Sequence, residues 1–390
     1  VAVLNLKSLH PVIPQEFTDV FDKDKYAESQ KYTRATTRFG LLQNSIMTPV
    51  TILFILLGGF NWVDNFARSL EQDSIITGLV FTGLLLLLSG LAGLPFSIYA
   101  TFVIEERFGF NKTTVKTFIL DIFKSIILGI VIGGPLLSLV LWFFETGGGL
   151  AWLYCWLIVV CFILVMQFIA PVAIMPLFNK FIPLEEGELK DSITDYARSQ
   201  GFKIKGIYTM DGSKRSTKLN AFFTGFGKFR RIVFFDTLME KLSTNEIVAV
   251  LAHEMGHYKK NHIFKMMAAS ILQMGIMFYI LSLFLNNKGL FAAFGMDHLS
   301  IYASLIFFGF LYSPISMILG IVVNFFSRRH EYEADAFAAS TTSGPQDLVS
   351  GLKKLSISNL ANLTPHPLHV FLNYSHPPVL ARIKALQDKR

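Results

Sequence analysis

Six long apolar stretches divide this chain of 390 residues, and polar segments of very different length separate them. Each stretch is close to the roughly 20 residues that a helix needs to cross the hydrocarbon of a bilayer. The stretches predict membrane spans at 45–62, 77–103, 125–143, 151–178, 264–285 and 302–326. The hydrophobic pattern therefore predicts a mainly α, polytopic membrane protein.

The polar segments complete the predicted organisation. The arm before the first span is long, and the chain begins at Val1 rather than Met, so we expect an upstream span to be missing. In chain order the expected parts are an N-terminal arm at 1–44, a four-span membrane region at 45–178, a polar insertion at 179–262, a two-span hairpin at 263–326 and a C-terminal portion at 327–390.

The insertion carries signals for a small α+β unit. An amphipathic pattern over 184–200, stopped by Gly201, predicts a helix. Strand-like runs follow at 204–210, 219–224 and 231–235, with a Gly-Phe-Gly turn at 225–227 before the last of them. Ser243 and Glu246 then form a capping box, which predicts the start of a helix.

Composition excludes an ordinary soluble enzyme. Hydrophobic residues make up 52% of the chain, which contains 38 Phe, and charged residues only 16%, with a mean hydropathy of +0.48. Soluble domains carry more charge than this. The formal net charge of +7 resembles that of a nucleic-acid-binding protein, but the distribution of Lys and Arg argues for another origin.

Positive charge falls on every second connection between the predicted spans. The first, third, fifth and last connections carry six, three, fourteen and eight Lys or Arg, and the three between them carry one, none and one. The positive-inside rule places the basic connections in the cytoplasm. The arm, the insertion and the C-terminal portion are therefore expected on the cytoplasmic face, close to lipid headgroups, and we expect no nucleic-acid partner.

A metal-binding motif lies near the end of the insertion. An H-E-x-x-H sequence runs from His253 to His257, inside a predicted helix at 245–262. Residues four apart share one helix face, so both imidazoles can bind one ion, and Zn²⁺ suits two neutral imidazoles plus a carboxylate. Glu254 lies about 100° further round the axis, where its carboxylate can take a proton from a water molecule on the metal. The motif predicts one zinc ion per chain and Glu254 as the general base.

A third protein ligand is expected directly after the last span. The hairpin at 263–326 returns the chain to the side on which His257 lies, and a catalytic zinc with two histidines needs one more protein ligand. Glu331 and Asp335 are four apart, so Glu331 can bind the metal while Asp335 accepts a hydrogen bond from a ligand imidazole. Glu333 would point away. Residue types and spacing alone leave four candidates, namely His330, Glu331, Glu333 and Asp335.

These motifs, taken with two more, resemble the CAAX prenyl protease 1 family of integral-membrane zinc metallopeptidases. The resemblance extends from about residue 15 to the end. It rests on H-E-x-x-H, on S-R-R-x-E-Y-x-A-D-A-F beginning at Ser327, on Asn220-Ala221-Phe222 before Arg231-Ile232-Val233, and on Ser375-His376-Pro377-Pro378 with Arg382. The family has seven spans around a water-filled chamber, and it removes the aaX tripeptide from prenylated CAAX proteins.

The resemblance also implies roles for individual residues. It implies that Glu331 completes the metal site, and that Asn220 and Ala221 belong to a strand that binds the substrate backbone. His376 and Arg382 would lie near the reacting carbonyl or support the site. The implied assignments are metal ligands His253, His257 and Glu331, catalytic residues Glu254, His376 and Asp335, and substrate-binding residues Asn220, Ala221 and Arg382.

Two other functions are compatible with these observations. A bacterial member of the family would process membrane proteins, or remove damaged ones, without requiring a prenyl group. A transporter or lipid-binding scaffold with a vestigial metal site would have lost its base, whereas Glu254 and the expected ligands are present. The expected location is the bacterial inner membrane or the endoplasmic reticulum, and the expected partners are a peptide or protein substrate and membrane lipid.

Overall fold

The computed structural model describes residues 1–224 and 231–388 and is built mostly of helices. Within the described residues, six helical segments are long and apolar enough to cross a membrane, which confirms the predicted fold class. They are Lys23–Leu56 (α2), Ser74–Glu105 (α4 and its π-helical continuation), Val115–Thr146 (α5 and α6), Gly148–Phe178 (α7 and α8), His262–Phe284 (α12) and Ile301–Thr341 (α14).

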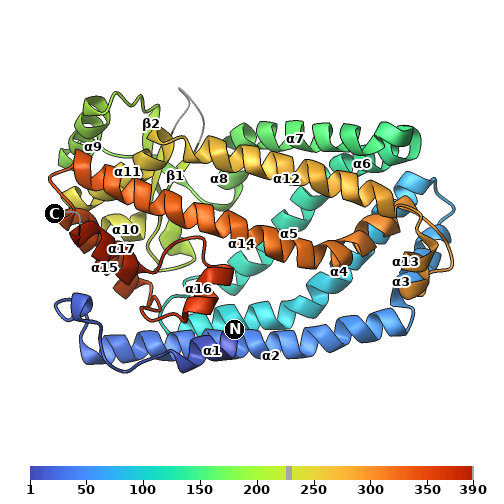
Figure 1. The fold of residues 1–390 in the computed structure, drawn as a ribbon, viewed down its shortest axis with the longest axis horizontal. Coiled ribbons are helices and arrows are strands. Elements are labelled where there is room, and N and C mark those ends of the chain that lie inside the picture. The colour runs from blue at the N-terminus through green and yellow to red at the C-terminus, as the bar shows by residue number, and fades with distance from the viewer. Residues whose placement is uncertain (225–230, 389–390) are drawn as a thin grey trace.

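The protein has a larger accessible surface than a compact protein of the same mass would have. In the most apolar part of each helix, no more than 17% of the residues are buried. The accessible surface is 20687 Å², whereas a compact soluble monomer of 43.9 kDa would expose about 15,000 Å². Figure 1 shows α2 along one side, α6, α7 and α12 along the opposite side, and α14 crossing between them. Extra surface of this size is expected of a bundle that lines a chamber as well as facing lipid.

The first long helix begins well before the predicted span. The Asp22 side chain accepts a hydrogen bond from the Lys25 amide at 2.6 Å, and this cap starts α2 at Lys23. Half of the predicted arm, 23–44, therefore belongs to α2. The helix ends where Gly58 adopts a φ of +69°, and α3 (Gly59–Arg68) follows.

The last long helix does not end at the predicted membrane surface. The apolar run ends near residue 326, but α14 continues without a break to Thr341, a length of 41 residues. The segment from His330 to Asp335 is thus a direct extension of a membrane helix, so its orientation about the axis is set by the packing of the whole helix.

A small mixed sheet covers one end of the bundle. Its strand order is β1-β2-β4-β3, with β2 and β4 parallel and β3 antiparallel at one edge. The strands are Phe181–Pro183 (β1), Gly206–Met210 (β2), Ala221–Thr224 (β3) and Arg231–Phe235 (β4). The turn predicted at 225–227 lies outside the described residues.

The helix predicted at 184–200 is shorter than expected. Leu184 donates its amide hydrogen to the Ile207 carbonyl at 2.9 Å and so extends the sheet. Gly187 then adopts a φ of +152°, and α9 begins at Glu188 and ends at Ser199. The predicted first turn was wrong because those backbone groups bond to a strand instead.

The helix with the H-E-x-x-H motif packs at the centre of this end. It is α11 (Thr244–Lys259), and Ile247, Leu251 and Met255 join the sheet in one buried core. Its most extensive helix contact is with α14. The remaining helices are Ala2–Lys7 (α1), Asp236–Met239 (α10), Lys288–Ala293 (α13), Gln346–Ser358 (α15), Pro367–Asn373 (α16) and Val379–Gln387 (α17).

Candidate metal centre

The start of α11 is fixed by its predicted capping box. The Ser243 amide donates to Glu246 Oε2 at 2.7 Å, and the Glu246 amide donates to Ser243 Oγ at 3.4 Å. Burial disfavours the charged form of Glu246, but hydrogen bonds from Lys354, Ser350 and the Ser243 backbone outweigh it and lower the pKa of Glu246. The carboxylate therefore ties α11 to α15 and holds the first turn in place.

A glycine between the two histidines lets α11 and α14 approach closely. A Cβ atom on Gly256 would lie 2.9 Å from the Cα atom of Ala334 and 3.1 Å from its carbonyl oxygen. Contacts that short do not occur between packed backbones, so a larger residue would push the helices apart. This close approach places Glu331, on α14, beside the imidazoles of α11.

Three side chains point their donor atoms at one place. The Nε2 atoms of His253 and His257 are 3.2 Å apart. Glu331 Oε1 lies 3.2 Å from His257 Nε2, and Glu331 Oε2 lies 3.5 Å from His253 Nε2. Bonds of roughly 2.05 Å at tetrahedral angles would separate ligand atoms by about 3.3 Å. These separations fit a tetrahedral zinc site.

The third donor also has an unsatisfied oxygen. Glu331 Oε2 is buried and accepts no hydrogen bond from any described residue. Its contacts are ion pairs, with Arg382 Nη1 at 3.3 Å and His253 Nε2 at 3.5 Å. A buried carboxylate oxygen without a hydrogen bond favours a bound cation. Among the described residues, these three form the one group of His, Cys, Asp or Glu that could hold a metal ion. The two imidazoles and one carboxylate are the donor set of a catalytic zinc site.

Asp335 contacts His253, one of the two predicted ligand histidines. Asp335 Oδ1 lies 2.8 Å from His253 Nδ1, on the side of the ring away from the metal donors. Arg382 donates to both oxygens of the same carboxylate, at 2.8 and 2.6 Å. The Asp335 carboxylate thus holds the ring with Nε2 directed at the metal position.

The local charges alter the protonation of His253. Burial disfavours its imidazolium form, but hydrogen bonds to Asp335 and Glu331 outweigh burial and raise the pKa of His253 to about 9 when no metal is bound. Burial likewise opposes the charge on Arg382, yet Asp335, Glu331 and Glu254 raise its pKa. The cluster therefore retains positive charge that balances its carboxylates.

The other predicted catalytic groups surround the donors. Glu254 is half-buried, and no hydrogen bond joins its side chain to another described residue. His376 Nε2 lies 3.4 Å from Glu331 Oε1, and the side chain is 65% exposed. Arg382 is buried and lies 3.3 Å from Glu331 Oε2. The C-terminal segment therefore supplies one accessible imidazole and one enclosed guanidinium group beside the metal position.

The predicted substrate strand is an edge strand. Asn220 precedes β3 and is exposed, and Ala221 begins the strand. Among the described hydrogen bonds and ion pairs, none joins either residue to the metal cluster. The edge of β3 away from β4 has no strand partner in the described sheet. An edge strand of this kind can pair with an extended peptide.

The side chain of Asn359, the residue after the end of α15, fixes Leu219, which lies two positions before this strand. Asn359 Oδ1 accepts from the Leu219 amide at 2.8 Å, and its Nδ2 donates to the Leu219 carbonyl at 3.1 Å. This pairing explains why Leu219 is not part of β3 although the sequence predicted a strand from residue 219. No sequence signal identified Asn359, because 140 positions separate it from Leu219.

Two residues without an assigned role at the metal site, His262 and Glu333, also lie beside it. Glu333 points away from the three donors, as expected, but it contacts His262 instead. His262 in turn contacts His257. The sequence signal that could have identified His262 is its place as a third histidine, five positions after His257.

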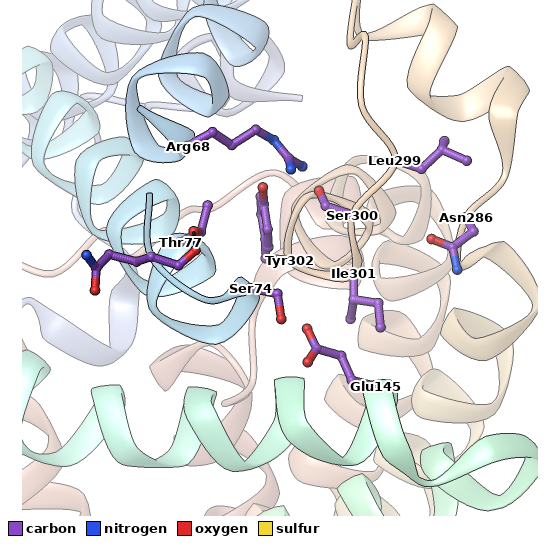
Figure 2. A pocket seen from close by; sticks show the side chains of 10 residues that line it. Arg68, Ser74, Thr77, Glu145, Asn286, Leu299, Ser300, Ile301 and Tyr302 are labelled. Atoms are coloured by element: carbon purple, nitrogen blue, oxygen red, sulfur yellow. Dashed lines mark hydrogen bonds between the residues drawn. The ribbon is translucent and has the colours of Figure 1, made fainter. Parts of the chain in front are cut away.

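A separate polar cavity lies at the end of the bundle opposite α11 (Figures 1 and 2). Its volume is about 450 Å³, and Figure 2 shows Arg68 and Tyr302 on one side with Glu145 across from them. Buried Asp64 accepts hydrogen bonds from Tyr302 at 2.5 Å and Arg68 at 2.7 Å. This network fastens α3 to α14, far from the metal cluster.

Both halves of the chain match known protein families. Residues 3–180 match a family described as "CAAX prenyl protease N-terminal, five membrane helices". Residues 183–390 match peptidase family M48. The second match contains all nine side chains that the sequence singled out for catalysis, substrate binding or metal binding.

Individual relatives align over nearly the whole chain. A CAAX prenyl protease 1 homolog from Oryza sativa subsp. japonica is 36% identical, covering 97% of this chain and 91% of the relative. The CAAX prenyl protease 1 of Saccharomyces cerevisiae is 37% identical, with 96% and 88% covered. The crystal structure of S. mikatae Ste24p matches with a TM-score of 0.92 and 36% identity, covering 99% of this chain and 94% of that one.

Proposed function

Because this chain belongs to peptidase family M48, within its CAAX prenyl protease 1 branch, and is a metallopeptidase of the membrane, we propose that it removes the aaX tripeptide from prenylated CAAX proteins in a zinc-dependent reaction. The observation that carries the metal assignment is that donor atoms of His253, His257 and Glu331 lie within 4.8 Å of one another, where a buried Glu331 oxygen has no hydrogen bond. The family matches favour this reading over a general quality-control protease and over a non-enzymatic scaffold.

The proposed metal ligands are His253, His257 and Glu331. Zinc at this position supplies a Lewis acid that polarises the peptide carbonyl and acidifies a water molecule. Asp335 keeps the His253 ring oriented through its 2.8 Å contact with Nδ1. Arg382 holds Asp335 in turn, so its part in substrate binding is indirect.

Glu254 is the proposed general base. Its carboxylate lies one residue beyond a ligand histidine and makes no hydrogen bond to another described side chain, so it is available to water. It takes a proton from the attacking water and delivers it to the nitrogen of the departing tripeptide. His376, which is largely exposed, donates a hydrogen bond to the carbonyl oxygen as negative charge develops there.

The substrate backbone is proposed to lie along β3. An extended C-terminal segment adds to this edge by backbone hydrogen bonds, with Asn220 and Ala221 at its start. The prenyl chain would then lie against apolar side chains of the membrane helices, where burying hydrocarbon contributes about 0.8 kcal/mol per CH₂. Because the membrane surrounds the helices, a lipid-anchored substrate is brought close to the site.

The charge pattern supports a cytoplasmic orientation of the site. Under this proposal the parts at 1–44, 179–262 and 327–390 lie in the cytoplasm, where a CAAX tail is available. The membrane is either the endoplasmic reticulum or the bacterial inner membrane, and membrane lipid is a partner. The basic residues follow topology, so no nucleic-acid partner is proposed.

A pair of peptides tests the substrate. One is a farnesylated CAAX peptide, and the other is identical except that its cysteine is unmodified. Purified protein in detergent or lipid should cleave the farnesylated peptide much faster and release the tripeptide. Equal rates on both peptides would refute the prenyl requirement and favour general processing of membrane proteins.

A further inference from the structure

His262 lies behind one of the proposed metal ligands. It is the first residue of α12, and only 2% of its surface is exposed. Its Nδ1 lies 3.1 Å from His257 Nδ1, and its Nε2 lies 3.0 Å from Glu333 Oε2. The three side chains therefore form a chain of contacts that ends at the ring nitrogen of His257 opposite the metal donors.

The hydrogen-bonding capacity of each group fixes the direction of this chain. Arg329 donates to the other oxygen of Glu333 at 3.1 Å, so this carboxylate is an ionised acceptor. His262 must then donate from Nε2. In a neutral imidazole that leaves a lone pair on Nδ1, which can only accept from His257 Nδ1. His257 therefore keeps the lone pair on Nε2, the atom 3.2 Å from both other donors.

We propose that His262 and Glu333 are positioning residues of the metal site, which hold His257 in the tautomer and orientation that binds the ion. This inference rests on the proposed zinc function. Each ligand histidine then has a carboxylate from α14 behind it. Asp335 contacts His253 directly, at 2.8 Å, and Glu333 reaches His257 through a second imidazole.

Packing alone would not require this arrangement. The His262 ring stacks on the His330 ring, with centroids 4.0 Å apart and an interplanar angle of 11°. Any flat ring could provide that contact. A polar role and a packing role therefore predict different results when the ring is replaced by other side chains.

The test compares three variants of the full-length protein with wild type. His262→Leu keeps bulk but removes both nitrogens. His262→Asn keeps an acceptor oxygen near the position of Nδ1, and His330→Phe keeps the stacked ring as the packing control. Zinc affinity is measured by competition with a chelator, and the visible spectrum of the Co²⁺-substituted protein reports the ligand geometry.

We expect His262→Leu to bind zinc about 10- to 100-fold more weakly and to change the Co²⁺ spectrum. His262→Asn should recover most of the affinity, and His330→Phe should bind like wild type. Equal losses in the Leu and Asn variants would overturn the hydrogen-bond role. Should the Leu variant fail to fold, Glu333→Gln must still weaken binding more than Arg329→Gln, and the reverse order would count against the proposal.

Zinc binding by wild type and by His262→Leu separates failure of the proposed function from failure of the positioning role. Wild-type protein that binds no zinc would overturn the proposed function, and this inference with it. Tight binding by wild type and by His262→Leu would overturn the positioning role alone.

Discussion

Replacing Asp335 by Asn removes one charge from the centre of the site and changes almost no volume. Asp335 accepts hydrogen bonds from His253 Nδ1 at 2.8 Å and from two nitrogens of Arg382 at 2.8 and 2.6 Å. An amide has one oxygen, which can accept hydrogen bonds from His253 and from one Arg382 nitrogen. Its NH₂ group must then face the other Arg382 nitrogen, which is also a donor. One charge-assisted hydrogen bond is lost in the better of the two amide orientations.

The size of the effect follows from this geometry. A buried hydrogen bond to a charged group is worth about 1.5–3 kcal/mol, so the metal-free fold should lose about that much stability. In the other amide orientation, the NH₂ group faces His253 Nδ1 and favours the tautomer with a proton on Nε2, which cannot bind metal. We therefore expect zinc affinity to fall about 10- to 100-fold.

The assay is zinc competition against a chelator, with thermal unfolding of the metal-free protein measured in parallel. Asp347→Asn is the matched control, because Asp347 is on α15 and its carboxylate bonds only to Ser343 among the described residues. Zinc affinity within twofold of wild type in a folded Asp335→Asn protein would refute the claim that Asp335 orients His253.

Three further predictions follow from neighbouring features. Gly256→Ala should destabilise the fold by about 1–3 kcal/mol and weaken zinc binding, because the new Cβ would lie 2.9 Å from Ala334 Cα. Thermal unfolding and chelator competition measure the two effects. Wild-type stability and zinc affinity in the variant would contradict the close approach of α11 and α14 at this glycine. Since the pKa of metal-free His253 is raised from 6.5 to about 9, its protonation stabilises the metal-free fold below pH 6.5, and this contribution is lost as the pH rises through 9. Zinc must displace that proton, so the logarithm of zinc affinity should rise by about one per pH unit between pH 7 and 9. Calorimetry in two buffers should detect about one proton released on zinc binding. A zinc affinity that does not change with pH would refute the assignment of His253 as a ligand. Asn359→Ala should raise KM for a CAAX peptide several-fold with kcat little changed, because only the start of β3 is loosened; an equal fall in kcat with KM constant would argue against it.

The sequence was sufficient to predict the membrane helices and α11. Both depend on local information, namely apolar length for the helices and the capping box with H-E-x-x-H for α11. The third ligand was different. Residue types left His330, Glu331, Glu333 and Asp335 open, because the rotation of α14 about its axis is set by contacts along all 41 residues. The predicted span ends at residue 326, where the polar residues begin, but the helix continues through this point to Thr341.

The parts that could not be predicted depend on long-range contacts. To predict the close approach of the helices at Gly256, one must know that Ala334 is the α14 residue opposite it. His262 and Glu333 are 71 positions apart in the chain, and their contact exists only because α12 and α14 pack side by side. Asn359 is a further example, since its amide recognises the backbone of Leu219 rather than any side-chain pattern.

The most direct test of the central claim is a paired measurement on wild type and Glu254→Gln. Zinc content is determined for both purified proteins, and both are then incubated with a farnesylated CAAX peptide. We expect about one zinc per chain in each protein, with release of the tripeptide by wild type only. Cleavage by zinc-loaded Glu254→Gln at the wild-type rate, or absence of zinc from folded wild type, would contradict it.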